Sequence, residues 1–326
     1  MTYLCGMKLL ITGATGLIGS EIVELFKKQG IPVNYLTTNK SKIVSKEHVK
    51  GFYWNPNINE IDLTCFEGVT TIMNLAGSNI SKRWSVENKN EIISSRINSL
   101  KTLNQALGKI DSKNINSFVS ASAIGIYPSS LSNYYSEDET QVDNSFLGEV
   151  VHAWEKEIDT MKHFGFTVAK IRIGLVLSPD GGVLPMLVKP IKNYVGAAFG
   201  TGKQWQSWIH VSDLAKIFIF VAQNNLSGIY NGVSPNPITN AKMVKEIAKI
   251  FNVPLVLPNI PRSIMKIILG EMSYLLFASQ RVSSKKIAKE GFNFEFPNIG
   301  NALQYFYPSG IGNNSQDHIP KEEFLS

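Results

Sequence analysis

Three glycines near the start of the chain, Gly13, Gly16 and Gly19, have the spacing of a phosphate-binding turn. A short apolar run at residues 9–11 precedes them and predicts a buried strand, and the apolar residues that follow recur at helical spacing. In such a unit the glycines allow a tight turn, close approach of the backbone to a pyrophosphate, and close packing of the helix on the sheet. The start of the helix adds free N–H groups and a partial positive charge. The pattern predicts a dinucleotide site, and the alternative is a glycine-rich turn without a ligand.

The end of the next predicted strand, residues 32–36, bears on which dinucleotide binds. An acidic side chain there accepts a hydrogen bond from the ribose 2′-hydroxyl of NAD, whereas basic and hydroxyl groups accommodate the 2′-phosphate of NADP. Here Thr37 and Thr38 follow the strand, Lys40 and Lys42 come next, and no acidic residue lies among them. The pattern favours NADP, unless the two lysines are ordinary loop charges.

Strand and helix patterns alternate through the first half of the chain and predict βαβ units around a parallel sheet. Further strands are expected at residues 51–54, 70–75, 117–123 and 167–177, with helices at 86–107 and 150–163. After residue 178 we expect a short helix at 185–194, a glycine-rich loop at 196–206, a helix at 211–222, a strand at 229–233 and helices at 241–251, 263–278 and 283–289.

These elements predict an α/β fold with a doubly wound parallel sheet of the Rossmann type. The dinucleotide-binding domain is expected over residues 7–178, with parts of 205–233 returning to it. A smaller C-terminal α/β region over residues 179–307 is expected to cap a substrate. The polar residues 308–326 are expected to form a disordered tail.

Composition narrows the class of protein. With 326 residues, 44% of them hydrophobic, the chain can bury a full core. The net charge of +6 comes from scattered lysines, so we expect neither a nucleic-acid partner nor a membrane partner. Two cysteines cannot form a disulfide framework, no run approaches the ~18 apolar residues of a membrane helix, and no signal peptide is recognisable. A cytoplasmic protein is expected. The five histidines are too dispersed for a metal site.

Further short motifs are spread along the chain in a recognisable order. On these motifs the chain resembles the extended branch of the short-chain dehydrogenase/reductase superfamily, and within it the atypical NADP-binding epimerase family, which is similar to nucleoside-diphosphate-sugar epimerases. The matching segments are residues 11–19, Asn74-Leu-Ala-Gly77, Arg83-Trp84, Ser95-Arg-Ile97, Ser120-Ala-Ser-Ala123, Ala153-Trp-Glu155, residues 200–205, Trp208-Ile-His210, Thr239-Asn-Ala241 and Gly270-Glu-Met272.

The resemblance implies a cofactor site assembled from the ends of strands. It assigns the pyrophosphate to the turn residues Gly13, Thr15, Gly16, Leu17, Ile18 and Gly19. It assigns the adenosine phosphate to Thr37 and Thr38, and the adenine-ribose edge to Leu75 and Ala76, with Gly77 beside them. It also implies that Glu91, Arg96 and Val176 lie near the cofactor.

The catalytic residues are less clearly marked. Active members of the superfamily use a tyrosine as general acid/base with a lysine four residues further on. No tyrosine of this chain has a lysine at that spacing, and Phe146 and Val150 stand in roughly those places. Ser122 matches a serine that binds a substrate oxygen, with a strand-end cap as the alternative. Tyr127 is a candidate acid, with a packed aromatic ring and a satisfied hydroxyl as the alternative.

Two hypotheses follow from the sequence. The first is an NADP-dependent oxidoreductase or epimerase-like enzyme that acts on a small polar substrate, nucleotide-linked or not. The second, which the missing Tyr/Lys pair favours, is a catalytically silent NADP-binding sensor or scaffold. A homodimer formed through the helix at 86–107 is an open alternative to a core-facing role for that helix.

Overall fold

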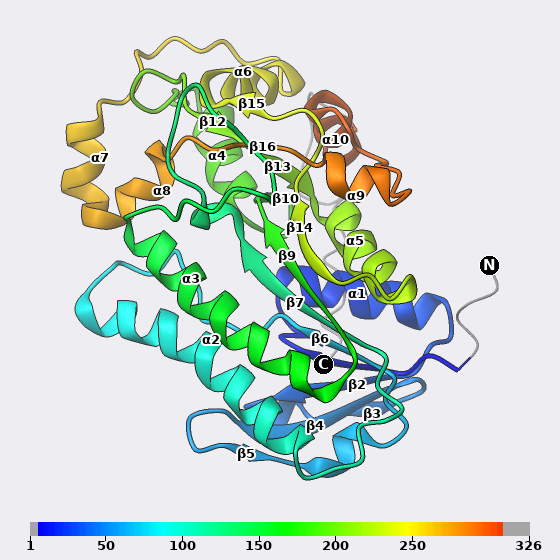
Figure 1. The fold of residues 1–326 in the computed structure, drawn as a ribbon. Helices are drawn as coiled ribbons and strands as arrows, with labels where there is room; N and C mark the ends of the chain where they lie inside the picture. Colours follow the sequence, from blue (N-terminus) through cyan, green and yellow to red (C-terminus); the bar gives the residue numbers. More distant parts are fainter. Residues whose placement is uncertain (1–5, 309–326) are drawn as a thin grey trace.

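A nine-stranded sheet forms the centre of the structure, a computed structural model that describes residues 6–308 (Figure 1). Its order is β14-β9-β7-β6-β1-β2-β4-β3, and β5 pairs with β4. All pairs are parallel except those that β3 and β5 make with β4. The strands are β1 (Leu9–Thr12), β2 (Val33–Thr37), β3 (Ser45–Lys46), β4 (Val49–Asn55), β5 (Glu60–Ile61), β6 (Thr71–Asn74), β7 (Ser117–Ala123), β9 (Thr167–Ile173) and β14 (Gly228–Gly232).

Helices cover both faces of this sheet. Helices α1 (Leu17–Lys28) and α5 (Val211–Gln223) pack together on one face, and α2 (Val86–Leu107) and α3 (Phe146–Asp159) lie side by side on the other (Figure 1). Strands covered on both faces are expected to be apolar throughout. Leu9, Leu10 and Ile11 of β1 are accordingly all buried. The doubly wound α/β fold predicted from the sequence is confirmed.

The C-terminal region adds three small sheets and several short helices with a core of their own. Strand β10 (Leu175–Ser178) lies between β11 (Gly181–Gly182) and β13 (Trp208–His210). Strand β12 (Trp205–Gln206) pairs with β15 (Ile238–Thr239), and β8 (Tyr134–Tyr135) pairs with β16 (Arg281–Val282). The helices are α4 (Val183–Lys192), α6 (Asn240–Ile250), α7 (Arg262–Leu269), α8 (Tyr274–Phe277), α9 (Lys285–Lys289) and α10 (Ile299–Phe306). Short 3-10 turns are η1 (Lys40–Lys42), η2 (Leu63–Phe66), η3 (Ile124–Ile126), η4 (Thr160–Phe164) and η5 (Gly270–Ser273).

The single strand predicted at residues 167–177 is wrong. The chain leaves the main sheet after β9, bends at Gly174 and continues as β10 in the smaller sheet. A Cβ atom at Gly174 would lie 2.3 Å from the carbonyl oxygen of Ser207, so the bend depends on glycine. This bend separates the sheet from the capping elements.

Two helix predictions also need correction. The continuous helix predicted at 263–278 is broken at Gly270, whose φ of +60° lies in the left-handed region that a helix cannot continue through. The helix predicted at 150–163 begins earlier, at Phe146, and ends at Asp159. The prediction also missed α10. The tail predicted at 308–326 lies, beyond Pro308, outside the described residues.

None of the helices within residues 6–308 combines the length and the apolar character that crossing a lipid bilayer requires.

Candidate functional site

The glycine-rich turn brings the end of β1 against the end of β6. Gly13 has a φ of +69°, and a Cβ atom there would lie 2.7 Å from the carbonyl oxygen of Leu75. A Cβ atom at Gly19 would lie 2.2 Å from the carbonyl oxygen of Gly13. Real Cβ atoms do not approach backbone so closely, so neither position accepts a side chain without moving the turn. The roles predicted for these two glycines, a tight turn and close packing of the helix, agree with this geometry.

The start of α1 offers donors for an anion. Helix α1 begins at Leu17, and Gly16 before it provides no side-chain cap. No acidic residue lies in the first turn, and Thr15 and Gly16 are exposed. The first N–H groups of a helix lack intrahelical partners and carry the positive end of the helix dipole. These residues fit the diphosphate of a dinucleotide.

A buried hydroxyl fixes the position of the neighbouring loop. Thr12 Oγ1 donates a hydrogen bond to Asn74 Oδ1 at 2.8 Å and accepts hydrogen bonds from the backbone N–H groups of Leu75 and Ala76, both at 3.0 Å. Leu75 and Ala76 are thereby held beside the glycine turn. Sequence reasoning missed Thr12, although its place directly before the first glycine was a usable signal.

The end of β2 has the polar character that a 2′-phosphate requires. Thr37 is buried and its hydroxyl accepts a hydrogen bond from the backbone N–H of Asn39, whereas Thr38 is exposed. The ammonium group of Lys40 lies 4.6 Å from the centroid of the Tyr53 ring. No carboxylate occurs between residues 37 and 42.

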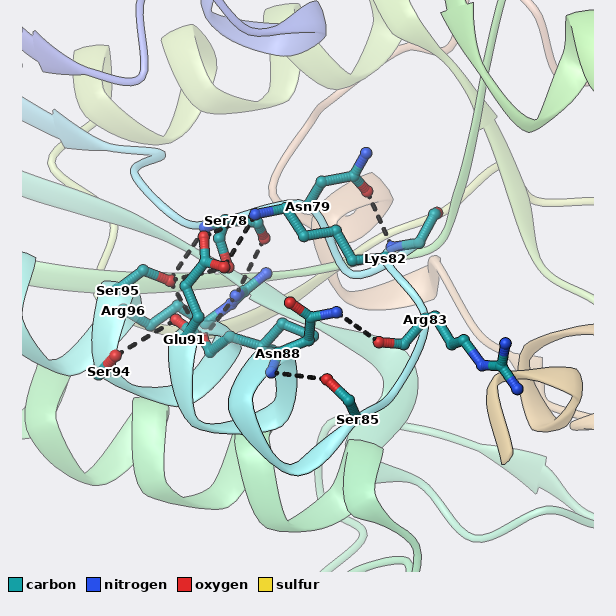
Figure 2. A network of polar contacts seen from close by, with 12 residues as sticks. Ser78, Asn79, Lys82, Arg83, Ser85, Asn88, Glu91, Ser94, Ser95 and Arg96 are labelled. Carbon is teal, nitrogen blue, oxygen red and sulfur yellow. Dashed lines mark hydrogen bonds and ion pairs between the residues drawn. The ribbon is translucent and has the colours of Figure 1, made fainter. Parts of the chain in front are cut away.

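The side chain of Arg96 on α2 lies beside Ser78 in the loop that follows β6 (Figure 2). Its Nη1 donates to the carbonyl oxygens of Ile92 at 2.8 Å and Ser78 at 3.3 Å. A Cβ atom at Gly77 would lie 3.1 Å from its Cζ. Burial lowers the pKa of Arg96 to about 10, and no carboxylate within the described residues forms an ion pair with it. A half-buried cation without a counter-charge favours an anion beside it.

The other two residues assigned to the cofactor lie in different surroundings. Glu91 forms an ion pair with Lys82 at 2.7 Å at the surface, which is part of the network in Figure 2. Val176 lies on β10 close to the glycine turn, because a Cβ atom at Gly182 would be 3.6 Å from the carbonyl oxygen of Val176 and 3.5 Å from the side chain of Leu17.

A cavity of about 270 Å³ opens at the carboxyl ends of β7 and β9. It begins beside Arg96, passes the strand ends at Ala123 and Gly174, and extends to Gln206 and Gln280. Its walls are mainly apolar, and the remaining lining residues are Ile80, Ile124, Gly125, Leu147, Val150, Val151, Trp154, Ile173, Leu175, Trp205, Ser207, Leu275 and Ala278. Arg96 is the one charged side chain among them. The cavity therefore adjoins the predicted cofactor residues.

A larger hollow of about 790 Å³ lies between the N-terminal ends of α2 and α3 and helix α7. It is more open, and none of the predicted cofactor residues lines it. We therefore take the smaller cavity as the candidate site.

The positions of the usual tyrosine and lysine carry apolar side chains. The Phe146 ring packs edge-on against Trp84, with ring centroids 5.0 Å apart. Val150 is buried and lines the cavity. Neither side chain can transfer a proton, as expected from the sequence.

Ser122 and Tyr127 belong to a buried polar network behind the cavity. Ser122 Oγ donates to Glu155 Oε1 at 2.6 Å, and Arg172 forms a two-point ion pair with Glu155 at 2.8 and 3.0 Å. Arg172 Nη1 also donates to the Tyr127 hydroxyl, which donates to Asn231 Oδ1 at 2.8 Å. Tyr127 is 0% exposed, and neither Ser122 nor Tyr127 lines the cavity.

Burial and charge set the protonation of this network. Burial raises the pKa of Tyr127 to about 12, even though Arg172 lowers it. Burial alone also raises the pKa of Glu155, but the hydrogen bonds and charge of Arg172, with Ser122 and Lys170, outweigh it and hold that pKa below its usual value. Glu155 is thus a structural carboxylate. The hydroxyl groups of Ser122 and Tyr127 are both hydrogen-bonded within this network. A catalytic role for either residue stays a prediction.

The turn, the helix start, the strand ends and the cavity define a Rossmann-type dinucleotide-binding protein of the extended short-chain dehydrogenase/reductase kind. The chain belongs to the NAD dependent epimerase/dehydratase family, whose profile matches residues 9–232. A second profile, a domain of unknown function (DUF1731), matches residues 260–306. The family resemblance inferred from the sequence motifs is confirmed.

Relatives of similar length support this assignment. The chain is 32% identical over 305 residues to the epimerase family protein YfhF of Bacillus subtilis, covering 91% of this chain and 97% of that protein. It is 34% identical over 304 residues to the epimerase family protein SERP0438 of Staphylococcus epidermidis, covering 90% and 97%.

Solved structures share the fold at lower identity. The human epimerase family protein SDR39U1, determined with NADPH, matches with a TM-score of 0.79 and 24% identity over 93% of this chain and 100% of that one. UDP-glucuronic acid 4-epimerase of Bacillus cereus, in complex with UDP-glucuronic acid and NAD, matches with a TM-score of 0.74 and 15% identity over 93% and 99%.

Replacement of Gly19 by alanine should disrupt the glycine turn, because the new Cβ would collide with the carbonyl oxygen of Gly13. We expect Gly19→Ala to lose at least about tenfold in dinucleotide affinity, measured by isothermal titration calorimetry with NADPH. Gly300→Ala is the matched control, since a Cβ atom at that helical glycine would have nothing within 4 Å. Equal affinities of the two variants would contradict the role of Gly19.

Replacement of Glu155 by glutamine should leave Arg172 buried without a counter-charge. We expect the free energy of unfolding to fall by about 3–5 kcal/mol at neutral pH. Because the folded pKa of Glu155 is depressed, its carboxylate stabilises the fold above the ordinary value of about 4.3, and this contribution is lost as the pH falls through the lower folded pKa.

The stability difference between Glu155→Gln and the unaltered chain should therefore narrow below about pH 4 in urea unfolding experiments. Glu271→Gln is the control, because Glu271 pairs with Lys89 at the surface and its side chain is 67% exposed. Removal of the Glu271 charge should lower the free energy of unfolding by less than about 1 kcal/mol. If Glu155→Gln lowered the free energy of unfolding as little as Glu271→Gln does, the buried pair of Glu155 and Arg172 would contribute little to stability.

Proposed function

We propose that this protein is an NADP(H)-dependent oxidoreductase or epimerase-like enzyme acting on a small substrate in the cavity at the ends of β7 and β9. One observation carries the proposal. Groups suited to each part of the cofactor occur in order along the carboxyl edge of adjacent parallel strands, and the cavity lies at the end of that row. Ligands of doubly wound folds bind outside the carboxyl ends of the strands.

The order of strands gives the direction of the cofactor. The sheet runs β2-β1-β6-β7, so Thr38, the glycine turn, Leu75 and Ala123 follow one another along its edge. Three strand spacings amount to roughly 14 Å. A dinucleotide laid along this edge has its adenosine phosphate at β2, its diphosphate at α1 and its nicotinamide toward the cavity.

The residues of the chain have separable tasks in this arrangement. A nicotinamide cofactor, when bound, supplies or accepts a hydride. The N–H groups at the start of α1 hold the diphosphate, Arg96 balances negative charge, and Thr38 with the nearby lysines accommodates the 2′-phosphate. The apolar walls of the cavity exclude water from the reacting atoms. The NADPH in the human relative's structure supports the choice of cofactor.

A catalytically silent sensor or scaffold is the second candidate function. It is favoured by Phe146 and Val150, which replace the pair that moves protons in related enzymes, and by the engagement of Ser122 and Tyr127 in a buried network. In that case the cofactor would be bound without turnover, and its occupancy would be read by a protein partner.

Cofactor choice is tested at Thr38. A carboxylate introduced by Thr38→Asp should repel a 2′-phosphate, so NADPH affinity should fall roughly tenfold or more while NADH affinity stays within about threefold. Thr38→Ala removes the hydroxyl without adding charge and serves as the control. Calorimetric titration with both nucleotides gives the ratio of the NADPH affinity to the NADH affinity for each variant. An equal loss for NADH and NADPH would argue against a 2′-phosphate at this strand end.

Enzyme and sensor are separated by turnover. The fluorescence of bound NADPH is followed while small ketones, aldehydes and nucleotide sugars are added one at a time. Oxidation that depends on one class of carbonyl supports the enzyme. Tight NADPH binding with no oxidation across the panel supports the sensor. If neither NADPH nor NADH binds, the enzyme and the sensor hypotheses are both wrong.

A further inference from the structure

The cavity wall contains polar groups of two kinds. Some are already bonded within the protein: Ser207 Oγ donates to the carbonyl oxygen of Gln280 and accepts from the N–H of Val282, and Gln280 Nε2 donates to the carbonyl oxygen of Tyr127. The indole N–H of Trp205 donates to the carbonyl oxygen of Leu131. The donors of Ser207 and Trp205 are thereby used within the protein, whereas no hydrogen bond within residues 6–308 involves Oε1 of Gln280.

Three buried side-chain atoms of residues in the same wall have no hydrogen-bond partner within residues 6–308. They are Nε of Arg96 on α2, Nε1 of Trp154 on α3 and Oε1 of Gln206 on β12. Trp154 is 6% exposed, and all three residues line the cavity. A buried donor or acceptor without a partner carries a free-energy cost, so such groups are rare in folded proteins. Here three occur around one small cavity, where a ligand can satisfy them.

The charges around the cavity determine which kind of ligand atom is favoured beside the indole N–H of Trp154. The guanidinium carbon of Arg96 lies 4.9 Å from the centroid of the Trp154 ring. Glu155, the next residue on α3, is paired with Arg172 and does not line the cavity. With a cation near the indole and no carboxylate in the wall, an oxygen that carries negative charge is favoured beside Trp154.

The size and walls of the cavity limit the rest of the ligand. A volume of about 270 Å³ is slightly below the usual range for ligand sites, roughly 300–1,000 Å³. The lining includes Leu147, Val150, Val151 and Leu275, which suit an apolar body. The hydroxyl groups of a sugar would find few partners there, because most of the lining residues are apolar.

We propose that the substrate is a compact carbonyl or carboxylate compound with an apolar body, rather than a nucleoside-diphosphate sugar. Its oxygen accepts a hydrogen bond from Trp154 Nε1, and the side-chain amide of Gln206 binds a second polar group. Trp154 is then a specificity-determining residue, one helical turn beyond the place of the usual lysine. This inference rests on the proposed function, since the substrate occupies the cavity beside the cofactor.

Benzoate is a suitable probe, because it joins a carboxylate to a flat apolar ring. Its affinity for the full chain saturated with NADP⁺ is measured by isothermal titration calorimetry and compared with those of benzylamine and UDP-glucose. We expect benzoate to bind at least about tenfold more tightly than benzylamine, whose cation Arg96 repels. Trp154→Phe, which keeps a packed ring but removes the N–H, should weaken benzoate binding about tenfold.

Trp84→Phe is the matched control. Its indole N–H donates to the carbonyl oxygen of Ile80, and Trp84 does not line the cavity, so benzoate affinity should change less than about twofold. The NADP⁺ affinity and thermal unfolding of both variants establish that they are folded.

Three results would overturn the inference: equal benzoate affinity in Trp154→Phe and the unaltered chain, binding of UDP-glucose in preference to benzoate, or no binding of benzoate. The comparison of benzoate with benzylamine uses the unaltered chain and so does not depend on the folding of a variant. Failure of the proposed function is detected separately, as a lack of affinity for NADP⁺. In that case, titration of the cofactor-free chain with benzoate still measures whether the cavity binds a carboxylate.

Discussion

The site depends on the close contact between the turn after β1 and the chain that leaves β6. Gly13 lies so near the carbonyl of Leu75 that no side chain fits between them, and the hydroxyl of Thr12 holds the backbone of Leu75 and Ala76 from beneath. One strand end thus positions the next. Helix α1 begins directly after this turn, and Arg96 donates a hydrogen bond to the carbonyl oxygen of Ser78 in the chain that leaves β6.

Behind the cavity, the groups that could transfer protons serve another purpose. Glu155, Arg172, Ser122 and Tyr127 satisfy one another, and together they join α3 to β7 and β9. Burying a charge is costly unless it is paired and hydrogen-bonded. The network meets that condition, which explains how a carboxylate and a guanidinium remain stable in the interior. The phenol of Tyr127, a member of this network, is 0% exposed and does not line the cavity.

Much of the fold and the glycine turn could be predicted from the sequence, because both depend on local patterns. Gly13, Gly16 and Gly19 between an apolar strand and an amphipathic helix indicated the turn, and alternating strands and helices indicated the sheet. The breaks at Gly174 and Gly270 were missed, because apolar periodicity continues across them. Gln206 could not be found either, since only folding brings β12 beside α3. Trp154 was visible on its helix, but its unpartnered N–H depends on what surrounds it in space.

The return of the chain to the main sheet has a consequence for how this architecture can be divided. Strand β14 completes the sheet beside β9 only after β10, α4 and β13 have formed part of the capping region. A fragment ending near residue 178 would present β9 as a bare edge, open to pairing with other chains. The cap is therefore divided between a segment inserted before β14 and a segment that follows it, so a single cut in the chain cannot separate the cap from the main sheet.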